Sequence, residues 1–293
     1  MNIVSHTKIY LGISITLILA SLLVLVVWGL ELGIDFTGGS IIEIEFSETR
    51  PSSNEVKEKL KNLELGKVSL KSADSKSLIL RLKNIDEETH QKILEKFGQG
   101  VEEKKFESIG PVIGTELKKK TLYAITLALL AIVLYVAWAF RNVSKPIASW
   151  QYGLVAIAAL FHDIVITLGV FALLGEIYKV EISLVLVAAF LTILGYSVNN
   201  SIVVFDRVRE NLIRTDWSDF RKTINQSINQ SLMRCLNTAL TTLFVLLAIF
   251  FIGGESIRYF ALALVIGIVV GTYSSIFTTT SLLTLWYERK YRR

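Results

Sequence analysis

The sequence predicts an α-helical polytopic membrane protein with six transmembrane helices and one small α+β domain between helices 1 and 2. Three observations indicate this fold class. Apolar residues make up 52% of the 293 residues, and the mean hydropathy is +0.51. This is too apolar for a soluble protein of such length. Six long apolar runs recur along the chain, and one polar stretch, residues 31–120, separates the first run from the second.

Each apolar run meets or approaches the length that a membrane span requires. A helix needs about 20 apolar residues to cross a hydrocarbon core of about 30 Å, because it rises about 1.5 Å per residue. The fifth run is short, and the alternative is an earlier start near residue 232. The sixth run is long enough to tilt or to follow the interface. The first run lacks a small-residue cleavage site, so we expect it to stay as a membrane anchor. The six runs cover residues 9–30, 122–140, 150–174, 182–205, 236–252 and 259–287.

Basic residues are distributed unevenly over the loops. Thirteen Lys and Arg residues lie in the N-terminus, the loops 141–146 and 206–234 and the tail after residue 287. The two opposite short loops hold two, Lys179 and Arg258. Because basic residues concentrate on the cytoplasmic side, we expect a multi-pass protein of the cytoplasmic membrane with both termini cytoplasmic. The net charge of +5 therefore indicates orientation and no nucleic-acid partner.

The stretch between helices 1 and 2 has the pattern of an extracytoplasmic α+β domain with ferredoxin-like order. Residues 40–46 alternate apolar and polar side chains, as a half-buried strand does. Ser52 and Glu55 form a capping-box pattern that opens a helix, and Asp86 caps a second helix that stops at Gly98. Further strands are expected at residues 67–71, 77–83 and 101–109. The resulting order is β-α-β-β-α-β.

This domain shows no constellation for catalysis. It has no cysteine and one histidine, His90, which we expect to be a solvated surface residue. Neither a metal site nor a nucleophile is visible, so no enzyme activity, metal or cofactor is expected. The only cysteine of the chain, Cys235, cannot form an internal disulfide.

Polar side chains inside the apolar runs are the candidate functional residues, because a charged group at the bilayer centre costs about 2.5–3.5 kcal/mol on insertion scales. His162 and Asp163 fall near the middle of the third run, and Asn199 and Asn200 lie in the fourth. A carboxyl group in a low-dielectric medium favours its acid form, which suits a group that picks up and releases protons. We therefore hypothesise that Asp163 takes part in proton or ion passage. The alternative is that His162 and Asp163 form a structural pair between helices.

The fifth run opens with further polar residues. Arg234 and Asn237 begin it at the cytoplasmic end, the same end as Asp206 after the fourth run. Asn200 and Asn237 should lie at similar depth and form a polar layer across helices. Such amides and the neighbouring threonines often serve only as hydrogen-bonding glue between helices.

Two patterns concern helix packing and the membrane surface. Ala263, Gly267, Gly271 and Ser275 recur at every fourth residue, which predicts a helix-packing face in the sixth run. Residues of about 216–231 predict an amphipathic helix on the cytoplasmic membrane surface. Its apolar face carries Trp217, Phe220, Ile224 and Ile228.

The predicted organisation has three parts. Residues 1–30 comprise the cytoplasmic N-terminus and the first helix, and residues 31–120 form the extracytoplasmic domain. Residues 121–293 contain helices 2–6, the amphipathic helix and a basic C-terminal tail.

Several motifs together resemble one family, SecF. The motif GIDFTGGS at residues 33–40 contains Asp35, Phe36, Thr37, Gly38 and Gly39. The others are GPVIGTEL at 110–117, His162-Asp163, GYSVNNSIVVFDRVREN at 195–211 and RCLNTALTT at 234–242. They cover all six spans in the expected order, so the chain is identified as a member of the SecF family.

The resemblance implies a subunit without enzyme activity. Members are similar to half of a resistance-nodulation-division transporter, with SecD as the other half. They work beside the SecYEG channel, assist preprotein export on the outer side and draw on protons, or on sodium in some members. ATP hydrolysis in the pathway belongs to SecA. The implied partners are SecD, SecYEG, translocating preprotein and membrane lipid.

Two other functions are alternatives to the assistance of preprotein export. The first is half of a small-molecule or lipid exporter of the same superfamily, but such exporters carry larger outer domains with a substrate pocket. The compact outer domain therefore favours export assistance. The second is a purely structural scaffold, for which the buried polar groups would be dispensable.

One departure from the family pattern concerns the fourth span. Where the family usually has Asn-Asp, this chain has Asn199-Asn200, and an amide cannot carry a proton at physiological pH. The proton-carrying role of the family's Asp can be taken by Asp163 or by a carboxylate on SecD. The third possibility is that the chain is poorly coupled to the ion gradient. Arg234, without that carboxylate opposite it, can pair with Asp206 or with the partner.

Overall fold

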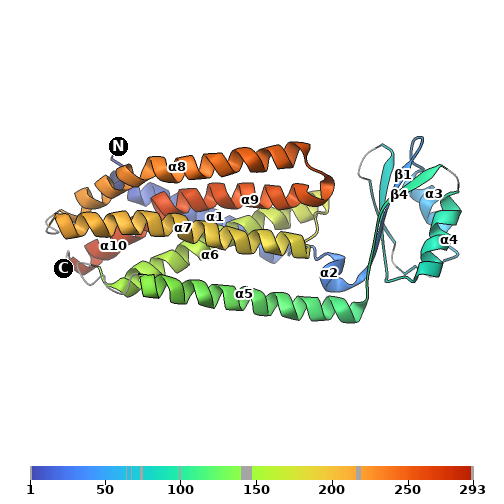
Figure 1. Cartoon of the computed structure of the whole chain (residues 1–293), viewed down its shortest axis with the longest axis horizontal. Coiled ribbons are helices and arrows are strands. Elements are labelled where there is room, and N and C mark those ends of the chain that lie inside the picture. The colour runs from blue at the N-terminus through green and yellow to red at the C-terminus, as the bar shows by residue number, and fades with distance from the viewer. Residues whose placement is uncertain are drawn as a thin grey trace. The chain divides into compact units, whose positions relative to one another are not determined.

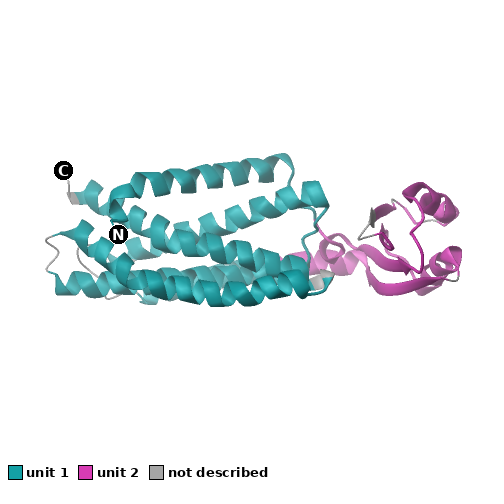
Figure 2. Ribbon diagram, turned by 90° about the horizontal axis from the view of Figure 1, so that it is seen from above, with its two compact units in different colours: residues 1–31, 124–293 teal, residues 32–123 magenta. Residues whose placement is uncertain are grey.

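The structure is a computed structural model, in which the chain folds into two compact units (Figure 2). It describes residues 2–63, 65–66, 68–72, 75–98, 100–139, 147–215 and 219–291. One unit comprises residues 1–31 and 124–293, and the other residues 32–123. Phe140, the predicted loop at 141–146 and Trp217 lie outside the described residues.

The first unit is a helix bundle. In the part of the chain that the structure describes, six helical segments are long and apolar enough to cross a membrane, which confirms the predicted spans. The sixth is interrupted by one turn of π-helix, η2. Both chain termini lie at the same end of the bundle (Figure 1). Its elements are η1 Val4–His6, α1 Thr7–Val27, α5 Pro111–Ala139, α6 Ser149–Tyr178, α7 Leu184–Arg214, α8 Phe220–Ile252, α9 Glu255–Tyr273, η2 Ser274–Thr278 and α10 Thr279–Tyr291.

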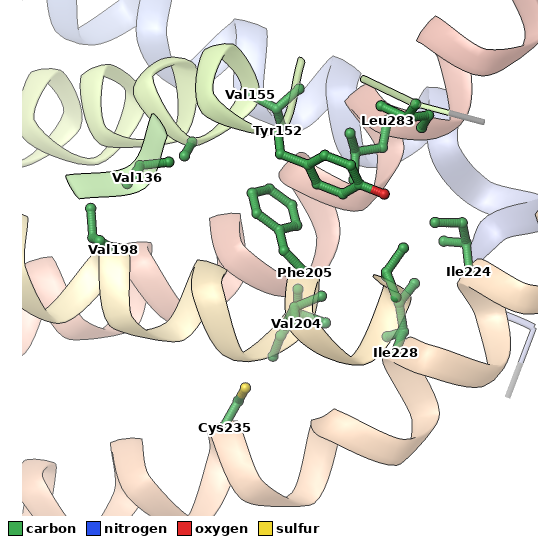
Figure 3. Packing of buried hydrophobic residues seen from close by; sticks show 14 of the residues in the cluster. Val136, Tyr152, Val155, Val198, Val204, Phe205, Ile224, Ile228, Cys235 and Leu283 are labelled. Carbon is green, nitrogen blue, oxygen red and sulfur yellow. The ribbon is translucent and has the colours of Figure 1, made fainter. Parts of the chain in front are cut away.

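Helix α7 packs against α6, α8 and α9 and supplies much of the buried core of the bundle. Tyr152 of α6 meets Phe205 of α7 edge to face, with ring centroids 5.4 Å apart and planes at 74° (Figure 3). Val204 and Cys235 lie in the same apolar cluster, so the cysteine is a core residue. Dense apolar packing around α7 fixes its rotation and therefore the direction of its polar residues.

Small residues allow these helices to approach closely. A Cβ atom at Gly267 of α9 would overlap the Ile193 side chain of α7, and one at Gly271 would lie 3.3 Å from the Ser197 Cβ. Gly169 of α6 meets Ser21 of α1 in the same way. Close approach through small residues replaces the hydrophobic driving force that is absent in lipid.

The prediction of a separate surface helix at 216–231 is wrong. Asp219 caps a helix by accepting from the Lys222 backbone N–H at 3.0 Å, and this helix continues without a break as α8 to Ile252. Phe220 and Ile224 are buried in the core of the bundle, and Phe220 stacks on Tyr287 at 4.0 Å. Helices α7 and α10 extend far enough to cover this apolar face, so protein takes the place that lipid was expected to hold.

The second unit contains a four-stranded antiparallel sheet of order β2-β3-β1-β4 among its described residues. Helices α3 and α4 follow β1 and β3, so the predicted ferredoxin-like order is confirmed. The helices bury Val56 and Ile93 against Ile42 and Leu80 of the sheet. The elements are α2 Ile34–Thr37, β1 Gly39–Phe46, α3 Ser53–Leu60, β2 Ser69–Ser72, β3 Ser77–Leu82, α4 Glu87–Phe97 and β4 Val101–Ile109.

The helix that carries the second span begins earlier than predicted. Helix α5 starts at Pro111, directly after β4 ends at Ile109, so the predicted boundary at residue 120 falls inside a continuous helix. The two compact units divide after residue 123, inside this helix. Helix α5 therefore contributes residues to both units.

The expectation that His90 is a solvated surface residue is wrong. His90 is 4% exposed and its ring stacks on Phe106, with centroids 3.8 Å apart and planes at 6°. Its Nδ1 lies 3.2 Å from Glu87 and its Nε2 3.2 Å from Glu103. His90 shares the face of α4 that buries Ile93 and covers the sheet, so its polar sequence neighbours concealed its burial.

Gly267→Ala is expected to lower the thermal stability of the purified protein, because the new methyl group has no space beside Ile193. Overpacking of this kind costs about 1–3 kcal/mol. Gly195→Ala on α7 is the matched control, since an added Cβ there meets no atom within 4 Å. Thermal unfolding in detergent, followed by circular dichroism, measures both. Equal melting temperatures for the two variants would contradict the packing account.

Candidate functional site

The candidate site centres on Asp163, in the interior of the helix bundle. Asp163 is 0% exposed and the preceding His162 is 1% exposed, both on α6. The two residues lie within the third candidate span, Trp150–Tyr178. An ionisable side chain held at this depth requires donors or partners from the surrounding helices.

Three side chains satisfy the carboxylate. The His162 Nδ1 lies 2.8 Å from Oδ1. The Ser274 hydroxyl donates to Oδ2 at 2.9 Å, and the Ser197 hydroxyl donates to the same oxygen. These donors come from α6, η2 and α7, and Gly271 leaves the space for their approach, because its ideal Cβ would lie 3.4 Å from Oδ2. The site is therefore built at the meeting point of three spans.

The π-helical turn η2 places two consecutive serines at the site. Ser274 faces Asp163, while Ser275 bonds the Ser201 hydroxyl of α7 at 3.1 Å and the Gly271 carbonyl oxygen at 2.6 Å. Both serines are 0% exposed. A π-turn inserts one residue into the helical ladder, and such insertions occur often at functional sites.

The other predicted relay residues lie apart from this centre. Asn200 is buried, and its Nδ2 has no hydrogen-bond partner among the described residues, whereas Asn199 is exposed. Arg234 is exposed on α8, and no salt bridge among the described residues joins it to Asp206. Asp206 is exposed and lies 4.0 Å from Arg209. The structure thus brings together His162 and Asp163 and none of these four.

Sequence reasoning missed Ser197 and Ser274. Ser197 stands inside the motif GYSVNN, two residues before the asparagines, and Ser274 directly precedes the last member of the small-residue stripe. A signal was present, because hydroxyl residues crowd the sixth run after residue 271. Only the phase of the helix, which the π-turn shifts, decides which hydroxyls face the carboxylate.

The side chains around Asp163 can serve a carboxyl group in either protonation state. Over the described ranges, no three His, Cys, Asp or Glu side chains gather in a way that could hold a metal ion. Hydroxyl groups and an imidazole can both donate and accept hydrogen bonds, so they can serve either protonation state of a carboxyl group.

A second motif site lies in the domain unit, where the two glycines of GIDFTGGS form a tight turn between α2 and β1. Gly38 has φ 71° and Gly39 has φ 126°, conformations that L side chains rarely adopt. A Cβ at Gly38 would lie 2.8 Å from the Pro111 Cα, and one at Gly114 would lie 2.8 Å from the Gly38 backbone nitrogen. The turn therefore presses against the first turns of α5.

Side chains around the turn hold it in place. Arg81 of β3 donates from Nη2 to the Leu32 carbonyl oxygen at 3.0 Å and to the Thr37 hydroxyl at 3.1 Å. Phe36 is buried, and Asp35 lies in the first turn of α2. The predicted motif residues thus shape a backbone junction between the start of the domain and α5.

Fold and site together define a six-span membrane protein with a ferredoxin-like domain after its first span and a hydrogen-bonded carboxyl group in its core. Residues 89–289 match the family described as the C-terminal part of the protein export membrane protein SecD/SecF. Residues 24–49 match the SecD/SecF GG motif, which contains the turn at Gly38 and Gly39.

Curated relatives match over nearly their whole length. The chain is 38% identical to a protein translocase subunit SecF of Thermobaculum terrenum, over 100% of this chain and 96% of the relative. It is 39% identical to the subunit of the same name from Rhodothermus marinus, over 94% and 90%. The chain belongs to the SecF family.

A solved structure has the same fold. The crystal structure of SecDF, a translocon-associated membrane protein from Thermus thermophilus, matches with a TM-score of 0.84 at 32% identity. The match covers 98% of this chain and 38% of that chain. The chain therefore corresponds to well under half the length of that SecDF.

Gly114→Ala is expected to loosen the junction between the glycine turn and α5, because its Cβ would lie 2.8 Å from the Gly38 nitrogen. Gly110→Ala is the matched control, since nothing lies within 4 Å of a Cβ there. Hydrogen exchange of the full chain measures the effect. We expect faster exchange over residues 33–40 in Gly114→Ala alone, and equal exchange in both variants would contradict the close approach.

Proposed function

We propose that this chain is the SecF subunit of a SecDF complex that assists Sec-dependent preprotein translocation across the cytoplasmic membrane. Proton or sodium motive force drives movement of the outer domains. The observation that carries the proposal is the buried Asp163 with donors from three spans. Family membership supports the export role, since the curated relatives are protein translocase subunits.

Protonation of Asp163 would reorganise the contact between α6 and the last span. The ionised carboxylate accepts hydrogen bonds on both oxygens. A neutral acid carries a proton on one oxygen and needs an acceptor there. Ser274 can then turn its hydroxyl to the Gly271 carbonyl oxygen, 3.2 Å away, and accept from Asp163. Each proton taken up or released thus alters a hydrogen bond that joins two helices.

Helix α5 provides the mechanical link to the outer domain. It runs without interruption from Pro111, beside the glycine turn, to Ala139 in the bundle. Only 6% of the most apolar stretch of this helix is buried within this chain. A rigid helix that few contacts restrain can shift when the bundle rearranges and carry that shift to the domain.

We also propose the orientation of the subunit in the membrane and its partners. Both termini face the cytoplasm, the domain is extracytoplasmic, and the subunit itself is not an enzyme. SecD is the direct partner, with SecYEG, SecA, preprotein and lipid in the same pathway. The alternative function, a small-molecule or lipid exporter, is not favoured, because the curated relatives are translocase subunits.

Asn200 does not preclude ion coupling under this proposal. Of the three ways to compensate for the missing family carboxylate, the geometry favours Asp163 in this chain, because Asp163 has a complete set of donors. The Nδ2 of Asn200 is itself a donor, and it is buried without an acceptor among the described residues. The exposed Arg234 on α8 is available to the partner subunit.

Asp163→Asn is expected to abolish export in cells depleted of their own SecD-SecF pair and supplied with this chain and its SecD. The amide cannot exchange a proton, although it preserves the shape of the side chain. Asp206→Asn makes the same chemical change at an exposed position outside the site and should rescue as the native chain does. Translocation of a reporter preprotein is measured at equal membrane abundance. Equal rescue by Asp163→Asn would reduce Asp163 to a packing role.

The double variant Asp163→Asn with Asn200→Asp tests which position carries the proton. We expect no rescue, because the serine and histidine donors surround residue 163 and not residue 200. The same export assay measures it, with Asn200→Asp alone as the control for folding. Restored export in the double variant would show that the two positions are interchangeable.

A further inference from the structure

Buried hydroxyl pairs continue from Asp163 toward the end of the bundle that holds both termini. Ser197 and Ser274 flank the carboxylate itself. Ser201 of α7 then meets Ser275 of η2 at 3.1 Å. Next to α1, the hydroxyls of Ser14 on that helix and Thr278 at the end of η2 lie 2.7 Å apart. We name these three pairs the hydroxyl rungs.

The second and third rungs each lie about one helical turn from the first. Ser201 is four residues from Ser197 on α7, and Thr278 is four residues from Ser274 along the last span. Four residues of helix rise about 6 Å. A single water that bonds at about 2.8 Å on each side spans a similar length. The second and the third rung are therefore each close enough to the first for one bridging water.

Unpartnered polar atoms on α6 and α9 indicate that ordered water enters the core of the bundle. His162 Nε2 and Thr272 Oγ1 are buried and have no hydrogen-bond partner among the described residues. Buried polar atoms without a protein partner are normally satisfied by ordered water. The unpartnered His162 nitrogen belongs to the residue that already bonds Asp163 through its other ring nitrogen.

The opposite direction along α7 and α9 is apolar. The buried residues of α7 that precede Ser197 are Leu186, Ala189, Phe190, Ile193 and Leu194. On α9, the buried residues before Gly271 include Ala263, Leu264 and Ile268. Along α7 and α9, the buried side chains on that side of Asp163 are therefore apolar, whereas α6 buries one hydroxyl there, that of Thr167.

We propose that the three hydroxyl rungs, with bridging waters, are the path by which protons reach and leave Asp163 on the side that faces the end of the bundle holding both termini. The inference rests on the proposed function, because it assumes that Asp163 exchanges protons. Each hydroxyl or water accepts a proton on a lone pair and passes on its own. No residue is changed after a proton has crossed, and no reactant other than water is needed.

A proton fits this route better than a sodium ion. The rung hydroxyls are in direct hydrogen-bond contact, at 3.1 Å and 2.7 Å, which leaves no space for a cation between them. Among the residues that the structure describes, Asp163 is the acidic group that bonds these hydroxyls. The bland alternative is that these residues bond only their own helices, as Thr279 does to the Ser275 carbonyl oxygen at 2.7 Å. Removing a rung hydroxyl distinguishes the two.

The test measures proton flux into liposomes that contain the full complex of this chain with SecD. A trapped pH-sensitive dye reports the flux, in sodium-free potassium buffer. Thr278→Val removes a rung hydroxyl without changing side-chain shape, and Thr278→Ser retains it. Thr284→Val is the matched control, because Thr284 is 0% exposed on the same span and bonds only the Thr280 carbonyl oxygen among the contacts found. Ser275→Ala tests the middle rung.

We expect Thr278→Val and Ser275→Ala to slow the flux about tenfold or more, as loss of a positioned proton-transfer group does. Thr278→Ser and Thr284→Val should match the native complex. Native flux in Thr278→Val and Ser275→Ala, with flux lost in Asp163→Asn, would overturn the route and leave the proposed function standing. Native flux in Asp163→Asn would overturn both. A loss in Thr284→Val equal to that in Thr278→Val would also overturn the route, because any buried hydroxyl would then suffice.

Discussion

The need to satisfy a carboxyl group inside a lipid-facing helix bundle constrains the rest of this structure. Asp163 is 0% exposed, and among the described residues His162 is the basic side chain that contacts it. Its oxygens must therefore be satisfied by neighbouring helices, at a depth where an unpaired polar group costs several kcal/mol. Ser197 and Ser274 supply the remaining hydrogen bonds, which requires α7 and the last span to approach α6 closely.

The small residues of the last span follow from this constraint. Gly267 and Gly271 leave no side chain between α9 and α7, and Gly271 also makes room for the carboxylate oxygen. The π-turn then adds one residue and turns two consecutive serines inward, toward α6 and α7. Helix packing and the hydrogen bonds of the carboxyl group thus share the same residues, so under the proposed function a change in protonation would alter the contacts between helices.

Sequence patterns predicted the spans and the small α+β domain because periodicity and length are local properties. Asp163 could be found for the same reason, as a carboxylate in an apolar run. Its serine donors could not, because the sequence does not reveal the phase of a helix that contains a π-turn. A surface helix and the protein-packed start of α8 have the same amphipathic pattern, and only the length of α7 and α10 separates them. The burial of His90 depends on the sheet that covers it.

The most direct test of the central claim is infrared difference spectroscopy of the purified complex during a pH step. The account predicts a carbonyl band of a protonated carboxylic acid that appears on acidification and is absent from Asp163→Asn. It also predicts that Ser274→Ala shifts this band, because that serine bonds the titrating oxygen. An identical band in the native complex and in Asp163→Asn would contradict the claim that the buried carboxyl group at the centre of this bundle exchanges protons.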